Sequence, residues 1–182
     1  MNDVTLIGQF FDFLENNNGQ IEDLYLSKTK KQKLESLIGA EKAKNFEVIV
    51  AHTSHSLVCF WVLNETTPKQ KHPIVWLDSE GAPNSVFAQN FEEFLSLIPY
   101  GSGTIYDILS SWLDYMDEPD STEPPLERFD KIYLEELLNE ANENENGLKE
   151  FILWLNKVNV KIAENPVELI RKAIKKYPDL LQ

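Results

Sequence analysis

Residues 72–101, HPIVWLDSEGAPNSVFAQNFEEFLSLIPYG, form the stretch that decides the fold. Residues 73–78 and 85–89 are short runs of β-branched and aromatic side chains, which favour β-strands. Asn90 follows as a helix N-cap, and Glu93 stands at the third helical position, the pattern of a capping box. The stretch therefore predicts a strand, a tight turn, a second strand and a helix in direct succession.

The turn between these two strands contains Asp78, Ser79, Glu80 and Gly81. If the strand continued, Asp78 and Glu80 would point to one face, where paired carboxylates can act as acid and base or hold a cation. Asp, Ser and Gly are also the residues that build turns, because Gly81 accepts a backbone angle that a Cβ would hinder. We interpret the four residues as a structural turn, with a small hydrolase using both carboxylates as the weaker alternative.

Two further strands and two helices are predicted on the N-terminal side. Residues 46–65 contain two runs of β-branched and aromatic residues joined by a short polar link, which is typical of an antiparallel pair. Residues 6–19 carry Leu and Phe at helical spacing and end at three Asn and a Gly, so they indicate a helix with a left-handed cap. Residues 27–38, rich in lysine and closed by Gly39, indicate a second, partly solvated helix.

The C-terminal half is predicted to be helical. Residues 104–116 form an amphipathic pattern, and the acidic segment 117–125 interrupts it because its prolines cannot continue a helix. Three more helices are predicted over residues 126–143, 147–163 and 165–177, the last with Asn as its N-cap and Pro at its first position.

This order of elements predicts an α+β fold, because helices and strands are grouped by type and do not alternate. We expect a single domain with a central four-stranded, largely antiparallel sheet flanked by helices. Residues 1–118 would form the α+β core, and residues 119–182 a C-terminal helical extension packed on the same domain. A chain of 182 residues can bury one substantial core, which agrees with one domain.

Composition narrows the classes of function. No apolar run reaches the roughly 20 residues of a membrane span, and the single cysteine, Cys59, lies inside an apolar run, so we expect a cytoplasmic protein with a buried thiol. His52, His55 and His72 lack the further ligands that a metal site needs. Phosphate-binding loops and nucleophile motifs are absent from the sequence, so neither a cofactor nor a metal is expected.

The acidic charge is concentrated in one quarter of the chain. The formal net charge is −13, and between positions 107 and 150 fourteen Asp and Glu stand against three Lys and Arg, a local balance of −11. Such a surface repels DNA and anionic lipid and attracts a basic protein partner by electrostatic steering. The sequence therefore favours protein binding over binding to nucleic acid or membranes.

Aromatic residues accompany these acids near position 115, as expected of a binding surface with an anchor and a charged rim. The alternative interpretation is that Trp112 belongs to the core and that the acids are only solvated. The predicted partner-binding residues are Trp112, Asp114, Tyr115, Asp117, Glu118, Asp120 and Glu123, with Glu135, Glu136 and Glu140 as an outer set.

Several segments resemble the SUKH superfamily, which groups yeast cell-wall-synthesis regulators with many bacterial immunity proteins. The resemblance is carried by PIVWLDSEG at 73–81, VFA at 86–88 and NFEEFLSLIPYG at 90–101, with FFDFLENNNG at 10–19 similar to the first helix of the family. Beyond Tyr115 the resemblance ends.

The resemblance implies a single α+β domain without enzymatic activity that works by binding another protein. Bacterial members of the superfamily are thought to neutralise toxins, often nucleases, and a basic nuclease cleft would accept an acidic, aromatic surface as a phosphate mimic. The leading hypothesis is an immunity protein that neutralises a bacterial toxin by direct binding. The alternative is a scaffold or regulatory interaction protein similar to the yeast members.

Overall fold

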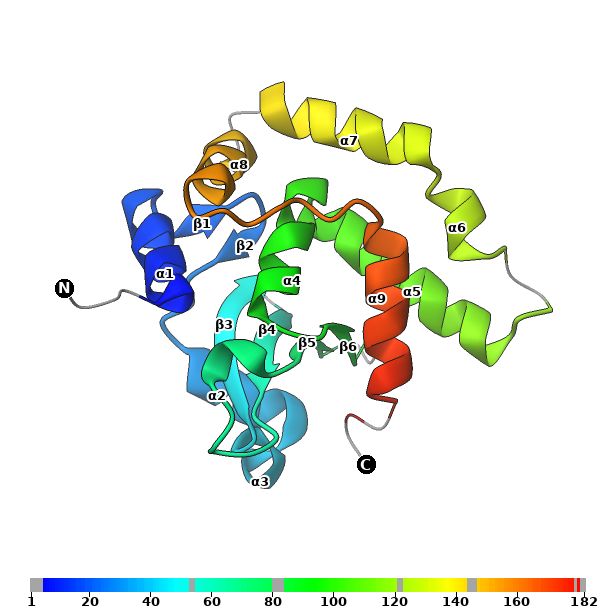
Figure 1. The fold of residues 1–182 in the computed structure, drawn as a ribbon. Helices are drawn as coiled ribbons and strands as arrows, with labels where there is room; N and C mark the ends of the chain where they lie inside the picture. The colour runs from blue at the N-terminus through cyan, green and yellow to red at the C-terminus, as the bar shows by residue number, and fades with distance from the viewer. Residues whose placement is uncertain are drawn as a thin grey trace.

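The computed structural model describes residues 5–52, 55–79, 84–120, 123–143, 147–178 and 180. Its strands form one antiparallel sheet whose spatial order follows the chain from β1 to β6 (Figure 1). The strands are β1 (Gln20–Ile21), β2 (Leu24–Tyr25), β3 (Phe46–His52), β4 (Ser56–Trp61), β5 (Ile74–Asp78) and β6 (Ser85–Ala88). The predicted α+β class is confirmed.

The predicted sheet of four strands was wrong in strand number. The four predicted strands are present as β3 to β6, and β1 and β2 extend the sheet to six strands within the described residues. These two strands are two residues long each, with Ile21 and Leu24 buried, and β2 pairs with β3 through Leu24 and His52. Two residues are too few to show a period of two, so this hairpin leaves no pattern in the sequence.

The two faces of the sheet are buried against separate layers of helices. Cross-strand partners share a face, so the pair Val58 and Trp76 lies in the larger core while the neighbouring pair Cys59 and Val75 lies in the smaller one. Because both faces are covered, the central strands read as continuous apolar runs without alternation.

The helices are distributed unequally over these two faces (Figure 1). Helices α1, α4, α5 and α8 supply side chains to the larger core, and α2 and α3 supply side chains to the smaller one. The helices are α1 (Leu6–Asn16), α2 (Lys30–Ile38), α3 (Ala40–Ala43), α4 (Phe91–Leu97), α5 (Ser102–Asp117), α6 (Pro125–Arg128), α7 (Lys131–Glu143), α8 (Leu148–Lys157) and α9 (Pro166–Lys176), with short 3₁₀ turns η1 (Lys69–Lys71) and η2 (Ile98–Tyr100).

Phenylalanine rings form the centre of the larger core. Phe10 of α1 meets Phe91 and Phe94 of α4 with ring centroids 5.5 and 6.2 Å apart, and it also meets Phe151 of α8 at 6.3 Å. All four rings are almost completely buried, and the pairs are edge-to-face, which is a favoured geometry for aromatic rings. The contact between Phe10 and Phe151 joins two helices that lie more than 130 residues apart in the sequence.

Helix α9 packs beside the edge strand β6 (Figure 1). Its Ile170 joins the larger core and its Ala173 the smaller one, so the helix meets both faces of the sheet at this edge. Asn165 caps it as predicted, accepting a hydrogen bond from the Glu168 amide at 3.0 Å. A helix at this position limits access to the unpaired edge of β6, where another chain would otherwise add a strand.

A carboxylate from a distant part of the sequence caps helix α5. Gly101 precedes the helix at φ +85°, a left-handed conformation that glycine adopts without strain. Glu22, in the hairpin between β1 and β2, accepts hydrogen bonds from the Ser102 amide at 2.6 Å and from the Ser102 hydroxyl at 2.9 Å. The cap thus joins the sheet edge to the start of the helix that leads into the acidic region.

Two predicted helical segments have different bounds in the structure. The segment predicted as one helix over 126–143 is divided into α6 and α7, because Asp130 caps the second helix by accepting a hydrogen bond from the Tyr133 amide at 2.9 Å. The segment predicted over 147–163 ends at Lys157, and Asn159 has a positive φ of 58°. No helix in the described ranges is both long and apolar enough to cross a bilayer.

Candidate functional site

The acidic region occupies the outside of α5, α6 and α7. Every acidic residue that the structure describes between positions 107 and 150 is exposed. The helices that carry most of these residues follow an arc in Figure 1, from α5 through α6 to α7. Like charges that stay fully hydrated cost little, and their combined field extends about 8–10 Å at physiological salt. The described acids therefore present a broad negative surface.

A groove of about 670 Å³ lies inside this arc, between α6 and α7 on one side and the segment that precedes α9 on the other. Leu126, Phe129, Leu134, Leu138 and Ile162 supply its apolar surface, and Asp130, Glu135, Glu164 and Lys131 supply its charges. Lys131 pairs with Glu135 at 3.5 Å, and both side chains are well exposed. The groove therefore combines an apolar floor with a rim that is net negative.

Hydrogen bonds hold the wall of the groove that precedes α9. The Tyr100 hydroxyl donates to the Ala163 carbonyl at 2.5 Å, and the Ala163 amide donates to the Ser96 carbonyl at 3.1 Å. Burial raises the pKa of Tyr100, because the phenolate would lose its hydration. The extended segment is thus tied to α4 and η2, which gives the groove one rigid side.

Large apolar side chains are exposed beside the acids. Leu126 is 44% exposed at the groove, and Ile132 and Tyr133 at the start of α7 are 69% and 41% exposed. Within α7 the residues Leu134 and Ala141 are buried, so the helix rests on the body through one stripe and presents Ile132 on another. Exposed apolar groups surrounded by charge are the composition expected of a protein-binding surface.

The predicted binding residues occupy three different environments. Trp112 is 5% exposed and donates its indole N–H to the Val167 carbonyl at 2.9 Å, so it lies in the core and does not face a partner in this conformation. Tyr115 is half-buried, with its ring 5.8 Å from that of Trp112. The remaining residues are exposed: Asp114, Asp117, Glu118, Asp120 and Glu123 near the end of α5, and Glu135, Glu136 and Glu140 on α7.

Only Glu135 of these predicted residues borders the groove. The apolar surface of the groove was missed because Leu126 and Leu134 fit the buried stripe of an ordinary amphipathic helix, and Ile162 was assigned to the preceding helix. The exposed pair Ile132 and Tyr133 offered the available signal, since two adjacent apolar residues cannot both lie on the buried side of one helix that also buries Leu134.

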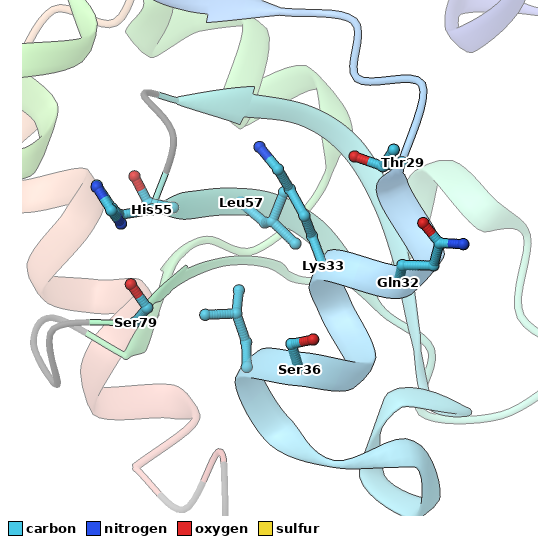
Figure 2. Close-up of a pocket in the computed structure, with 9 residues that line it drawn as sticks. Thr29, Gln32, Lys33, Ser36, His55, Leu57 and Ser79 are labelled. Carbon is cyan, nitrogen blue, oxygen red and sulfur yellow. The ribbon is translucent and has the colours of Figure 1, made fainter.

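The predicted turn at Asp78–Gly81 is only partly visible, because Glu80 and Gly81 lie outside the described residues. Asp78 ends β5, and its amide donates to the Asn84 side chain at 2.8 Å. The Ser79 amide donates to the His55 carbonyl at 3.1 Å, and Ser79 lines a cavity with His55 (Figure 2). The contacts at Asp78 and Ser79 are those of a strand end held by its neighbours.

The three histidines differ in their environments. His52 lies half-buried, with Nδ1 3.1 Å from the Ser56 hydroxyl and its ring 4.8 Å from that of Trp76, while His55 is exposed and His72 is buried. Burial lowers the pKa of His52, and nearby carboxylates, Asp23 first among them, oppose this effect. The described side chains contain no group of three His, Cys, Asp or Glu suited to a metal ion.

Cys59 lies on β4 and is fully buried. Burial raises the pKa of its thiol far above the ordinary range, because a thiolate would have no water around it. Since the thiolate is the nucleophile, this thiol is unreactive in the folded protein.

Comparisons with models of protein families, with curated proteins and with solved structures found no match for this chain.

Proposed function

We propose that this protein is a non-enzymatic binding module that holds a basic protein partner on the acidic surface of α5, α6 and α7. The observation that carries the proposal is the groove between α6–α7 and the segment before α9, in which an apolar floor is bordered by Asp130, Glu135 and Glu164. An apolar side chain of the partner would enter the groove, and basic side chains around it would meet the rim.

The floor and the rim of the groove would contribute differently to binding. Apolar contacts in the groove would contribute most of the affinity, at about 25 cal/mol per Å² of apolar area removed from water. The exposed acids would mainly raise the association rate, because rim charges steer the partner and remain partly hydrated in the complex. This division predicts that groove variants change the dissociation rate and that charge variants change the association rate and its salt dependence.

The partner class that suits this surface is a bacterial toxin domain, and we propose inhibition by occlusion. A toxin that acts on nucleic acid needs a basic cleft for phosphates, and a dense array of carboxylates competes for that cleft. The resemblance of residues 73–101 to the SUKH superfamily supports the same assignment, since its bacterial members are thought to act as immunity proteins. The protein would act by stoichiometric binding and would itself carry out no reaction.

The test uses the product of the adjacent reading frame as the binding partner. Calorimetry at several salt concentrations should compare the wild type with the triple charge reversal E135K/E136K/E140K and with the matched control E15K/E41K/E65K. Both variants change the net charge equally and replace only exposed residues. We expect the α7 variant to lose at least tenfold in affinity, about 1.4 kcal/mol, and to flatten the salt slope, with the control near wild type.

A growth assay separates inhibition from simple binding. Co-expression of the wild-type chain should restore growth to cells that make the toxin, and L126D, at an exposed floor position, should fail to restore it. Equal affinities and salt slopes for the two triple variants would refute the placement on α7. Tight binding without rescue of growth would instead indicate the scaffold role.

A further inference from the structure

A second cavity, of about 390 Å³, lies between helix α2 and the ends of strands β4 and β5 (Figure 2). This volume falls in the range of small-molecule sites, roughly 300–1,000 Å³. It lies on the face of the sheet that packs against α2 and α3, away from the acidic surface of α5, α6 and α7. Its nine described lining residues come from α2 and the residue before it, and from the facing ends of β4 and β5.

The lining combines an apolar floor with a polar rim, and the rim residues that can carry charge are basic. Leu37 from α2 and the buried Leu57 from β4 form the floor. The side chains of this lining that can carry charge are Lys33 and His55, and none of the nine is a carboxylate. In a chain with 30 acidic and 17 basic residues, the lack of an acid among the described lining residues favours an anionic ligand.

The polar groups stand on different walls of the cavity. Figure 2 shows Lys33 and Ser36 on α2, whereas His55 and Ser79 come from the strand ends across from the helix. The Ser79 amide donates to the His55 carbonyl at 3.1 Å, which holds these two residues together. Lys33 is half-buried, with its amine 3.5 Å from the Tyr25 hydroxyl and 5.8 Å from the centre of that ring. Donors therefore border the apolar floor from two sides.

The surrounding surface has the opposite charge to the rest of the protein. Residues 28–44, which include α2 and α3, contain six lysines and two glutamates, a local balance of +4 in a chain of −13. In Figure 1 these helices lie at the opposite end of the molecule from α6 and α7. An anion approaching the protein is therefore attracted to this end and repelled from the acidic arc.

We propose that this cavity binds a small amphipathic anion, a molecule with a short apolar body and one carboxylate or phosphate group. The apolar body would contact Leu37 and Leu57, and the anionic group would accept hydrogen bonds from Lys33 and from the rim hydroxyls of Ser36 or Ser79. Charge-assisted hydrogen bonds next to an apolar floor are the combination that gives such sites both orientation and affinity. The site is independent of the proposed partner surface.

The probes that test this proposal are hexanoate, hexyl phosphate, hexylamine and hexanol, each titrated into the full chain and followed by ¹H–¹⁵N chemical shifts. Hexanoate has eight non-hydrogen atoms, and at ~0.5 kcal/mol per atom its dissociation constant would be about 1 mM. We expect both anions to bind and to shift the amides of Lys33, His55 and Ser79, with hexylamine and hexanol at least tenfold weaker. The tighter of the two anions identifies the head group.

Two variants and a matched control locate the site. K33Q and the double variant S36A/S79A should each weaken hexanoate binding at least fivefold, whereas K31Q should leave it unchanged, because the Lys31 side chain is 88% exposed and pairs with Glu35 at 3.8 Å. Equal binding of hexanol and hexanoate would overturn the proposal, as would equal losses in K33Q and K31Q or shifts confined to other regions. Because no toxin enters this experiment, its failure leaves the proposed function unaffected.

Discussion

Replacing Glu22 by alanine should destabilise the protein from a position outside its hydrophobic core. In the folded state this carboxylate accepts hydrogen bonds from the Ser102 amide at 2.6 Å and the Ser102 hydroxyl at 2.9 Å, at the first turn of the 16-residue helix α5. No capping side chain comes from Gly101 itself. The negative charge also interacts favourably with the positive end of the helix dipole.

The magnitude follows from these two contributions. Loss of an N-capping acceptor costs about 1 kcal/mol, and loss of a charge at a helix N-terminus costs about 0.3–1 kcal/mol. With the additional hydroxyl bond, E22A should lower the free energy of unfolding by ~2 kcal/mol, and the melting temperature of a chain of this length by ~4–8 °C. E22Q keeps an acceptor but not the charge, so it should lose about half as much. Glu22 has φ +50°, and alanine bears the same backbone cost there.

Urea unfolding followed by circular dichroism measures these losses, and hydrogen exchange of the Ser102 amide locates them. The matched control is D23A, which removes an exposed carboxylate from the same turn. We expect the order D23A, E22Q, E22A in increasing loss of stability, with faster exchange at Ser102 in E22A alone. If E22A and D23A lost equal stability, the capping role of this carboxylate would be refuted.

Two further predictions concern His52 and Trp112. The pKa of His52 is lower in the folded protein than in the unfolded chain, so its contribution to stability is complete above the unfolded pKa of about 6.5 and is lost as the pH falls through the folded pKa. The free energy of unfolding should therefore fall between pH 7.5 and 5 less steeply in H52Q than in the wild type. Equal slopes for the two proteins would contradict this. W112F removes the hydrogen bond to the Val167 carbonyl and part of the core volume, so urea unfolding should show a loss of about 1–3 kcal/mol with partner affinity unchanged. Lost affinity with normal stability would show instead that the indole contacts the partner.

The elements that could be predicted from the sequence are those whose signals are local. Strands β3 to β6 follow from short runs of β-branched and aromatic residues between polar links, and the starts of α4 and α9 follow from Asn90 and Asn165, whose side chains bond to amides three residues later. The exposure of the described acids between positions 107 and 150 follows from the cost of burying unpaired charge. Each of these inferences needs only a few neighbouring residues.

Contacts between distant residues decided the rest. The sequence indicated that Trp112 and Leu126 lie on apolar stripes. Trp112 is buried because α9 packs against it, whereas Leu126 is exposed because it borders the groove beside the segment before α9. The pairing of Glu22 with Ser102, 80 residues away, and the meeting of Lys33 with His55 at one cavity have no local pattern either. Amphipathicity determines which side of an element avoids water, whereas what covers that side depends on how the whole chain closes.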